Sequence, residues 1–461
     1  MRQRTIKNAT SISGVGLHTG IHVSVTIKPA PENHGYRFMR MDLDGQPYIN
    51  AEVSKVSMTK RGTTLQQGEA EVHTVEHILS ALRGMEVDNV LIEIDGSELP
   101  ILDGSAQGYV QMIAEAGIEE QEAERKYFEI TAPIVFHDEE NGVEIVGLPA
   151  DSFESLVLID FNSPILGKQY AEFDKNIDYK KDIAPCRTFV FLRDVEGLFE
   201  KNLIKGGSLD NAIVIADKEV SPEAIESLAK KLGKSELQLS GKGILNTDLR
   251  ADNEPARHKL LDLIGDTALL GVHIKGKIIA TRPGHRVNVE FTKLLKAAYL
   301  KQQKFAHIPK YDPNQKPIMT VNQISEWLPH RYPFLLVDKV IELSDKHAVG
   351  VKSVTANEEF FQGHFPGNPV MPAVLQIEAM AQTGGILVLS TVEEPSNYDT
   401  YFLKISNAKF KAKVVPGDTL LFKVEITAPI RRGICQVKGS TYVGNTLVSE
   451  ADMVAQIVKR N

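Results

Sequence analysis

Cysteine, long apolar runs and excess positive charge are all scarce in this sequence. Only two cysteines, Cys186 and Cys435, occur among 461 residues, so we expect neither a disulfide framework nor a cysteine-based zinc site. No run of about 18 apolar residues occurs, and the start, MRQRTIKNATSISG, lacks an apolar signal region, which predicts a cytoplasmic protein without transmembrane segments. The net charge of −8 argues against general nucleic-acid binding, which needs a basic surface.

The first part of the chain alternates strand-like and helix-like patterns twice. The predicted strands lie at 21–30, 89–96, 127–136, 141–150 and 155–161, and the predicted helices lie at 75–85, 106–117, near 221–233, and at 255–270. We therefore expect an α+β protein with two similar subdomains, 1–126 and 127–300, each a sheet backed by helices. The pattern alone does not establish a duplication.

The composition and the secondary-structure pattern of the sequence change after residue 300. Three prolines in the polar segment 301–317 predict an extended linker. The remainder, 318–461, contains one apolar helix pattern at 373–390 among long strand patterns. These strands are predicted at 334–343, 401–415, 418–430 and 432–444. We expect a single helix wrapped by antiparallel strands.

One helical segment, RHKLLDLIGD, carries His258, Asp262 and Asp266 at every fourth position. On a helix these side chains fan over only ~80° of one face, while the leucines take the other side. Such a polar stripe is usually a solvated helix face, but imidazole and carboxylate one turn apart also bind divalent metals. This segment alone leaves both interpretations open.

A second histidine-rich segment is VHTVEHILSAL, in which His73, Glu76 and His77 fit the inverted zinc-protease motif. A motif this short arises by chance. Combined with His258 and Asp262, however, His77 completes a three-ligand set of the kind that catalytic zinc requires. Glu76, adjacent to a ligand, can then accept a proton from water on the metal.

The segment RPGHRVNVEF adds a possible general acid. We place His285 in a glycine-containing loop before a strand. There it can donate a proton, with Asp266 orienting the ring or stabilising its cationic form.

From residue 1 to about 300 the sequence resembles the zinc-dependent deacetylases that act on UDP-3-O-acyl-N-acetylglucosamine in lipid A biosynthesis. The resemblance rests on GVGLHTG, HTVEHILSAL, ELPILDGSA, CRTF, RHKLLDLIGD and GHRVN in this order. It implies a pair of two-layer α/β sandwich subdomains and one Zn²⁺ per chain. The implied ligands are His77, His258 and Asp262, and His73 is not among them.

The same resemblance implies the roles of the other site residues. Glu76 would be the general base and His285 the general acid, with Asp266 beside it. Thr188 would stabilise the oxyanion through its hydroxyl, Lys259 would point toward the phosphate-bearing part of the UDP-sugar lipid precursor, and His18 would give substrate-side support.

In the second part, GHFPGNPVMPAVLQIEAMAQ places His364 in a loop and Glu378 on the apolar helix. A base and an acid of these types suit a β-elimination. Either residue can instead be structural, His364 as a ring packed on Phe365 and Glu378 as the partner of a distant lysine.

Residues 318–459 resemble the 3-hydroxyacyl-[acyl-carrier-protein] dehydratases, a hot-dog fold, through this segment together with LPHRYPFLLVDKV and VVPGD. The resemblance implies that His364 removes the C2 proton and Glu378 protonates the departing hydroxyl. The two residues would come from different subunits, which requires a homodimer and is compatible with a hexamer. Ala373 stands where the family usually has glycine.

Lys409, Lys411 and Lys413 alternate with apolar residues, so on the predicted strand they share one face. This face is either an exposed, solubilising surface or a docking surface for acidic acyl carrier protein.

Together these patterns predict a bifunctional enzyme, a zinc deacetylase fused to a dehydratase. The alternatives are an inverted-motif zinc protease for the first part, and a hot-dog thioesterase or a non-catalytic acyl-binding oligomerisation module for the second.

Overall fold

The computed structural model describes residues 1–194, 205–208, 211–216, 237, 239, 243–245 and 247–460. The helix predicted near 221–233 lies outside these residues. The chain divides into two compact units, Met1–Leu300 and Lys301–Asn461, called here unit 1 and unit 2. Across the described residues, no helix combines the length and apolarity that crossing a membrane requires.

Unit 1 contains two large sheets, with strand orders β2-β3-β9-β4-β5 and β12-β13-β19-β14-β15, the latter extended by β11 beside β19. The first sheet consists of β2 (Thr10–Val15), β3 (His22–Pro29), β4 (Tyr36–Arg40), β5 (Tyr48–Asn50) and β9 (Val90–Ile94). The second consists of β11 (Tyr127–Glu129), β12 (Ile134–Asp138), β13 (Val143–Leu148), β14 (Phe153–Asp160), β15 (Lys168–Phe173) and β19 (His273–Thr281).

The two sheets share one topology. In each, the strand that comes last in sequence lies in the middle, antiparallel to the second strand and parallel to the third. A helix precedes this central strand, α1 (Glu76–Gly84) or α5 (Glu254–Ala268), and another follows it, α2 (Gln107–Ala116) or α6 (His285–Phe305). Unit 1 is therefore a duplicated α/β arrangement, which the sequence pattern left undecided.

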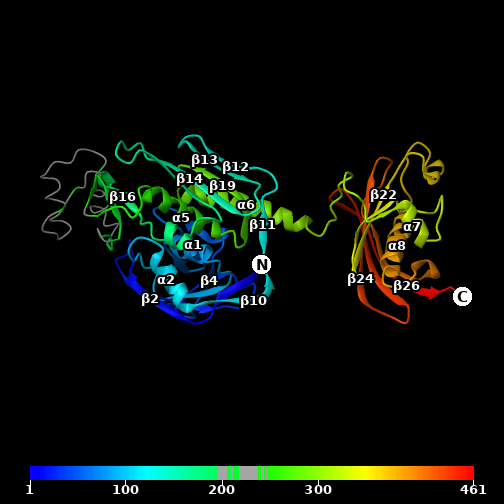
Figure 1. Cartoon of the computed structure of the whole chain (residues 1–461), viewed down its shortest axis with the longest axis horizontal. Helices are drawn as coiled ribbons and strands as arrows, with labels where there is room; N and C mark the ends of the chain where they lie inside the picture. Colours follow the sequence, from blue (N-terminus) through cyan, green and yellow to red (C-terminus); the bar gives the residue numbers. More distant parts are fainter. Residues whose placement is uncertain are drawn as a thin grey trace. The chain divides into compact units, whose positions relative to one another are not determined.

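Helices α1 and α5 pack against each other between the two sheets (Figure 1). The apolar side chains of α5 that the sequence assigned to a buried face, including Leu260, Leu261 and Ile264, are buried. Burying one such side chain contributes roughly 1.5–3 kcal/mol. The apolar face thus fixes the rotation of α5 about its axis, and with it the direction of the polar stripe.

Smaller elements complete unit 1. They are β1 (Arg2–Ile6), which pairs with β10 (Ile118–Glu124); β6 (Val56–Met58), β7 (Thr64–Gln67) and β8 (Ala70–Val72); and β16 (Phe189–Phe191), β17 (Ile213–Ile215) and β18 (Ile244–Leu245). Short helices η1 (Val53–Lys55) and η2 (Tyr179–Ile183) lie between them.

Two predictions about unit 1 are wrong. The single strand expected at 127–136 is two strands, and β11 pairs with β19 while β12 pairs with β13. His285 does not precede a strand, because it is the first residue of α6. Val287, Val289 and Phe291 alternate like strand residues, but the buried set continues to Leu295 at helical spacing.

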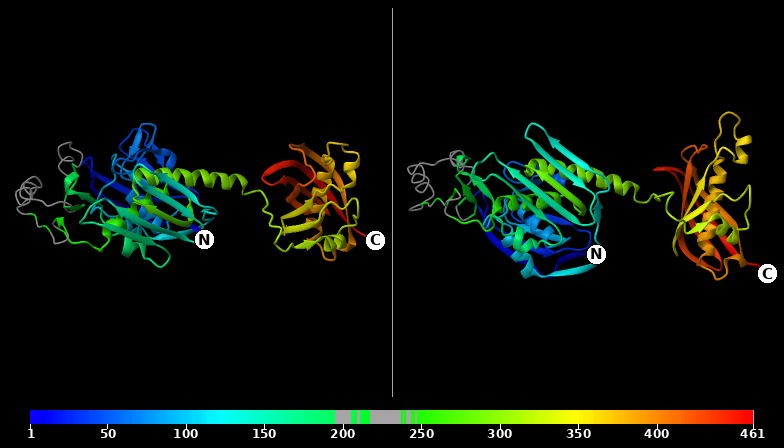
Figure 2. Two further views of the ribbon diagram at one scale, coloured as in Figure 1. Left: turned by 90° about the horizontal axis from the view of Figure 1, so that it is seen from above. Right: turned by 45° about the horizontal axis from the view of Figure 1, so that its top comes forward.

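Unit 2 is one seven-stranded antiparallel sheet, in the order β20-β21-β22-β24-β25-β26-β23, with α8 (Ala373–Leu389) packed against it (Figures 1 and 2). The strands are β20 (Met319–Thr320), β21 (Lys339–Leu343), β22 (His347–Ser353), β23 (Tyr398–Phe410), β24 (Thr419–Arg431), β25 (Ile434–Val443) and β26 (Thr446–Lys459). The short elements are α7 (Val321–Trp327), η3 (Glu359–Gln362) and η4 (Pro395–Asn397). The predicted hot-dog arrangement is confirmed.

Three boundaries in this part differ from the prediction. Helix α6 continues to Phe305, and Ile308 is buried against Leu421 and Tyr442 of the unit 2 sheet, so the segment predicted as an extended linker is partly helical and partly packed. Strand β21 starts only at Lys339, because residues 335–337 close over α8 as a loop. Strand β23 ends at Phe410.

Candidate metal centre and acid–base residues

The N-terminus of α1 lies directly on α5 because α5 has a glycine at the crossing point. A Cβ atom added at Gly265 would lie 2.1 Å from the carbonyl oxygen of Glu76, a distance that no side chain can occupy. This contact places His77, on the first turn of α1, beside His258 and Asp262 on α5.

His77, His258 and Asp262 form a buried cluster whose candidate ligand atoms lie within 4.8 Å of one another. Asp262 Oδ1 lies 3.9 Å from His77 Nε2 and 3.5 Å from His258 Nε2. A tetrahedral zinc with bonds of about 2.0–2.1 Å separates its ligand atoms by about 3.3 Å. The cluster is therefore close to the dimensions of a zinc site, and slightly wider.

The hydrogen bonds of the cluster leave its metal-facing atoms available. His258 Nδ1 lies 3.0 Å from the carbonyl oxygen of Cys186, so Nδ1 donates and the Nε2 lone pair faces Asp262. Asp262 Oδ1 is buried and accepts no hydrogen bond within the described residues. A buried carboxylate oxygen without a donor, between two imidazole nitrogens, is the arrangement expected around a cation.

Burial and charge set the protonation states that metal binding needs. Burial, reinforced by His258, lowers the pKa of His77 to about 3, and burial likewise lowers the pKa of His258. Burial alone would raise the pKa of Asp262, but Lys259 and the neighbouring histidines outweigh it and hold that pKa well below its ordinary value. Neutral imidazoles and an ionised carboxylate are the binding forms of these ligands.

Glu76 and His285 lie together next to this cluster. His285 Nε2 is 3.9 Å from Glu76 Oε1 and 3.8 Å from Asp262 Oδ2. The backbone N–H of Thr63 donates to Glu76 Oε2 over 2.9 Å and fixes that carboxyl group. Burial, followed by the nearby aspartates, raises the pKa of Glu76 to about 7 against the opposing effect of His285.

Asp266 holds the other nitrogen of His285, Nδ1, at 3.1 Å from its Oδ2. Thr63 Oγ1 and Asn288 Nδ2 donate to the same carboxylate at 2.6 and 2.9 Å. Burial alone would lower the pKa of His285, but the surrounding carboxylates, Asp266 first, raise it to about 9. His285 is therefore oriented with Nε2 toward Glu76 and Asp262.

The predicted oxyanion-stabilising residue, Thr188, and the two predicted substrate-binding residues of unit 1 lie in different surroundings. Lys259 Nζ donates to Asp262 Oδ2 at 2.7 Å, so in this structure it pairs with the metal cluster. The backbone N–H of Thr188 donates to the carbonyl oxygen of Gly104 at 2.7 Å. His18 lines a cavity of about 240 Å³ with Arg61, and its Nε2 lies 3.1 Å from the Arg61 carbonyl oxygen.

His73 is outside the metal cluster. Its Nδ1 lies 2.9 Å from Thr64 Oγ1 and its Nε2 lies 3.3 Å from Glu71 Oε1. The inverted protease motif therefore supplies only one metal-facing histidine, His77, and the protease interpretation loses its second ligand.

Several supporting residues were not found by sequence reasoning. The buried Arg187, within CRTF, donates to Glu254 at the start of α5 at 2.9 Å, which ties the Cys186 carbonyl and Thr188 to the helix that carries the ligands. Glu98 accepts the backbone N–H groups of His18 and Thr19 at 2.9 and 2.8 Å. The motifs ELPILDGSA and CRTF contained these residues, but nothing in them indicated the partners.

In unit 2 the structure places His364 and Glu378 in separate surroundings. His364 Nδ1 lies 2.7 Å from the carbonyl oxygen of Val370, so Nδ1 donates and Nε2 is left as a base. Glu378 Oε1 accepts Gln382 Nε2 at 2.9 Å and lies 3.5 Å from His330 Nε2. Within the described chain, no hydrogen bond or ion pair joins His364 to Glu378.

Glu378 borders a cavity of about 230 Å³ that reaches the edge strand β23 through Tyr401 and Phe402. Among the described strands it pairs with β26 alone, and it exposes a row of large apolar side chains. They are Tyr401, Phe402, Leu403, Ile405 and Phe410, each at least 42% exposed. A long edge strand with exposed apolar residues is a surface on which another strand can pair.

The predicted lysine stripe is only partly on a strand. Lys409 lies near the end of β23, whereas Lys411 and Lys413 follow it, because the chain turns inward to bury Val414. Glu450 lies 3.7 Å from Lys409 and 3.0 Å from Lys411. The prediction that one strand carries all three lysines is therefore wrong, although all three lysines are exposed and two of them approach the same carboxylate.

Comparison with known proteins agrees with both halves of this description. The family model for LpxC, UDP-3-O-acyl N-acetylglycosamine deacetylase, matches residues 3–231 and 226–297. The model for the FabA-like domain matches residues 328–452.

Relatives that match along the whole chain are described as "Bifunctional enzyme LpxC/FabZ". One from Bacteroides thetaiotaomicron is 52% identical over 100% of this chain and 99% of its own length. Another, from Porphyromonas gingivalis, is 50% identical over 99% of both chains, and one from Chlorobaculum tepidum is 46% identical over 100% and 99%. The chain therefore belongs to the LpxC/FabZ family of bifunctional enzymes, with an LpxC-type deacetylase as unit 1 and a FabA-like dehydratase as unit 2.

Proposed function

We propose that unit 1 hydrolyses the acetamide of a UDP-3-O-(3-hydroxyacyl)-N-acetylglucosamine with one Zn²⁺ held by His77, His258 and Asp262. The observation that carries the proposal is the buried Asp262 Oδ1, which has no hydrogen-bond donor in the described part of the chain and lies between two imidazole Nε2 atoms. A zinc ion supplies an acidified water and a Lewis acid when it is bound there.

The roles of the surrounding residues follow from their positions. The carboxylate of Glu76, fixed by the Thr63 N–H, accepts the proton of the attacking water. His285 Nε2, held in place by Asp266, donates a proton to the departing amine nitrogen. The Thr188 hydroxyl stabilises the oxyanion, and Lys259 and His18 contact the substrate.

A variant of one ligand tests the metal assignment. His258→Ala should lower zinc affinity more than ~100-fold and should abolish deacetylation. This loss exceeds the one expected when a residue that only hydrogen-bonds a metal ligand is replaced. Elemental analysis of the purified variant measures the metal, and the thermal unfolding transition of unit 1 in the same preparation controls for folding. A full zinc content in the variant would refute the ligand set.

We also propose that unit 2 converts 3-hydroxyacyl to trans-2-enoyl groups on acyl carrier protein, in a homodimer whose sites each use His364 of one subunit and Glu378 of the other. His364 takes the C2 proton, the C2–C3 double bond forms, and Glu378 protonates the hydroxyl leaving C3 as water. The separate surroundings of the two side chains within one chain and the exposed edge strand β23 support this arrangement. Lys409, near the end of that strand, and Lys411, just after it, would attract the acidic carrier.

Subunit complementation tests this proposal. Co-expressed His364→Ala and Glu378→Gln chains should regain about one quarter of the wild-type dehydratase activity, because random pairing makes half of the dimers mixed and each mixed dimer has one intact site. Each variant alone should be inactive. Inactive preparations in which mixed dimers are demonstrated, by two different affinity tags, would show that both residues act within one chain.

A further inference from the structure

A second polar cavity in unit 1 lies at the other end of α1 from the metal cluster. It has a volume of about 220 Å³ and is lined by residues of the first repeat, the connection between the repeats and the start of β19. Glu76 begins α1, and Arg83, which lines the cavity, comes seven residues later, about 10 Å along the helix axis. None of the residues assigned above to deacetylation lines this cavity.

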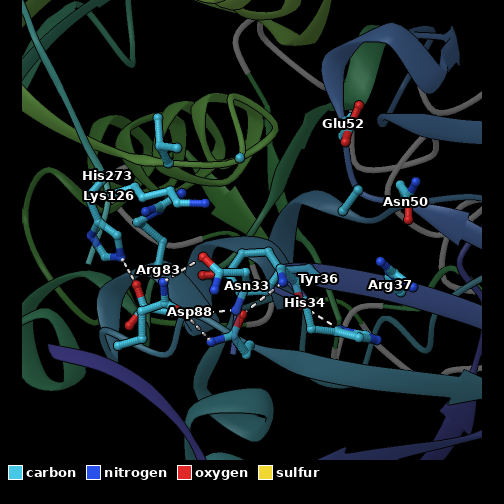
Figure 3. Close-up of a pocket in the computed structure, with 16 residues that line it drawn as sticks. Asn33, His34, Tyr36, Arg37, Asn50, Glu52, Arg83, Asp88, Lys126 and His273 are labelled. Atoms are coloured by element: carbon cyan, nitrogen blue, oxygen red, sulfur yellow. Dashed lines mark hydrogen bonds and ion pairs between the residues drawn. The ribbon is translucent and has the colours of Figure 1, made fainter. Parts of the chain in front are cut away.

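Three permanently charged cations line it, Arg37, Arg83 and Lys126. Figure 3 shows Arg83 and Lys126 near His273 on one side of the cavity, with Arg37 on the other. Among the described residues, none of the three forms an ion pair with a carboxylate. Arg83 makes one long contact, 3.4 Å from Nη2 to the carbonyl oxygen of Ala268, and Arg37 Nε is buried without a partner.

The acidic residues of the cavity do not balance these cations. Asp88 accepts Arg125 Nε at 3.0 Å and Nη2 at 2.9 Å, and its Oδ1 lies 2.9 Å from His273 Nε2. Arg125 does not line the cavity, so it neutralises Asp88 from outside. Glu52 is the other acid of the lining, and the cavity therefore has an excess of positive charge.

The wall next to these cations is a rigid, hydrogen-bonded network. Gln3 accepts Asn89 Nδ2 at 2.9 Å and donates to Asn33 Oδ1 at 3.2 Å, while the Gly35 N–H donates to Asn89 Oδ1 at 2.8 Å. These amides satisfy one another, whereas the three cations have no carboxylate partner among the described residues, and Arg37 only stacks on Tyr48, with its Cζ atom 5.3 Å from the ring centroid. Unpaired cations around a preformed cavity are a recognition site for an anion.

We propose that this cavity binds a small phosphate ester, with Arg83 and Lys126 as the ligands of the phosphate group. A guanidinium donates two parallel hydrogen bonds to phosphate oxygens, and an ammonium adds the second positive charge that a dianion requires. Arg83 belongs to the first repeat, Lys126 to the connection, and Gly271 and His273 of the lining to the second repeat. A bound phosphate ester therefore joins the two repeats and stabilises unit 1 against unfolding.

Thermal unfolding of the full chain tests this binding. Glycerol 3-phosphate, compared with KCl at equal ionic strength, should raise the midpoint of the unit 1 transition by about 2 °C. Lys126→Gln and Arg83→Gln should each raise the glycerol 3-phosphate concentration needed for this shift at least ~10-fold, since each removes a charge-assisted hydrogen bond. Lys126 is exposed, so its variant decides the question if Arg83→Gln does not fold.

Two controls separate this cavity from other anion sites. Lys175→Gln, an exposed lysine outside the cavity, should respond like the wild type. Lys259→Gln reports phosphate binding at the deacetylase site, so a response lost in Lys259→Gln but kept in Lys126→Gln would overturn the proposal. No response in the wild type, or a response to inorganic phosphate without one to the ester, would also overturn it.

Discussion

At the scale of single residues, the candidate acid and base of unit 1 are fixed in place by hydrogen bonds from neighbouring residues. Asp266 fixes the ring of His285 and is itself fixed by Thr63 and Asn288. The same Thr63 fixes Glu76 through its backbone N–H. Thr63, directly before β7, therefore positions both the proposed base and the partner of the proposed acid.

The first prediction concerns Asp266 and the pH dependence of deacetylation. The carboxylates around His285 raise its pKa to about 9, so the protonated acid persists above neutral pH and is lost as the pH rises through that value. A bound zinc ion repels the imidazolium and moves this alkaline limit below 9. Asp266→Asn removes a negative charge and should move the alkaline limb of the kcat profile to lower pH by about one unit or more.

Asp151→Asn is the matched control, because Asp151 is an exposed aspartate elsewhere in the same unit. It should leave the alkaline limb in place. An Asp266→Asn enzyme with lower activity but an unchanged limb would show that Asp266 is structural and does not set the pKa of His285.

At the scale of elements, the metal cluster depends on how closely α1 approaches α5. The ligands come from equivalent helices of the two repeats, so neither repeat contains a complete site. Gly265 permits the approach, because any side chain there would meet the backbone at Glu76. The leucines of α5 supply the burial energy that holds the helix in this position.

The second prediction follows from this contact. Gly265→Ala places a Cβ atom 2.1 Å from the Glu76 carbonyl oxygen, so the helices must separate. We expect a loss of roughly 1–3 kcal/mol in the free energy of unfolding of unit 1, together with weaker zinc binding. Denaturant unfolding and elemental analysis measure the two effects.

Gly284→Ala provides the comparison, since a Cβ atom there meets nothing within 4 Å. Its stability should stay within about 0.5 kcal/mol of the wild type. Equal stability of the two variants would mean that the α1–α5 contact adapts and does not constrain the site.

At the scale of the whole molecule, the two units carry different chemistry. The one cluster of metal-spaced ligands among the described residues lies in unit 1, and the proposed acid–base residues of unit 2 would act on a proton that the thioester already makes acidic. Each unit also has its own hydrophobic core. The two activities should therefore respond separately to loss of metal.

The third prediction is that a strong chelator abolishes deacetylation and leaves dehydration within about twofold of its starting rate, since only the first reaction needs an activated water. Stoichiometric zinc should restore the lost activity. Both rates are measured on one preparation before and after chelation. Parallel loss of both activities in a protein that remains folded and oligomeric would contradict the assignment of one metal to unit 1.

Local sequence signals determined much of this protein. The spacing of His258, Asp262 and Asp266 required one helix face, separate from the face of Leu260 and Leu261, which is a property of 3.6-residue periodicity. That this polar face is itself buried against α1 was not encoded in the segment. The order of motifs indicated the family, and the single apolar helix among long strands indicated the fold of unit 2. Its helix, Ala373–Leu389, differs from the predicted range by one residue.

Tertiary structure decided what depends on contacts between distant segments. The shared topology of the two repeats depends on strand pairings, which single-segment patterns do not encode. His285 starts a helix because Val287, Phe291 and Leu295 are buried in the same core at helical spacing. Strand β23 ends at Phe410, shortly before Val414 enters the core. The cation-lined cavity joins residues from Gln3 to His273, and only folding brings their charges together, because charges separated in sequence interact only when the chain places them within a few ångströms.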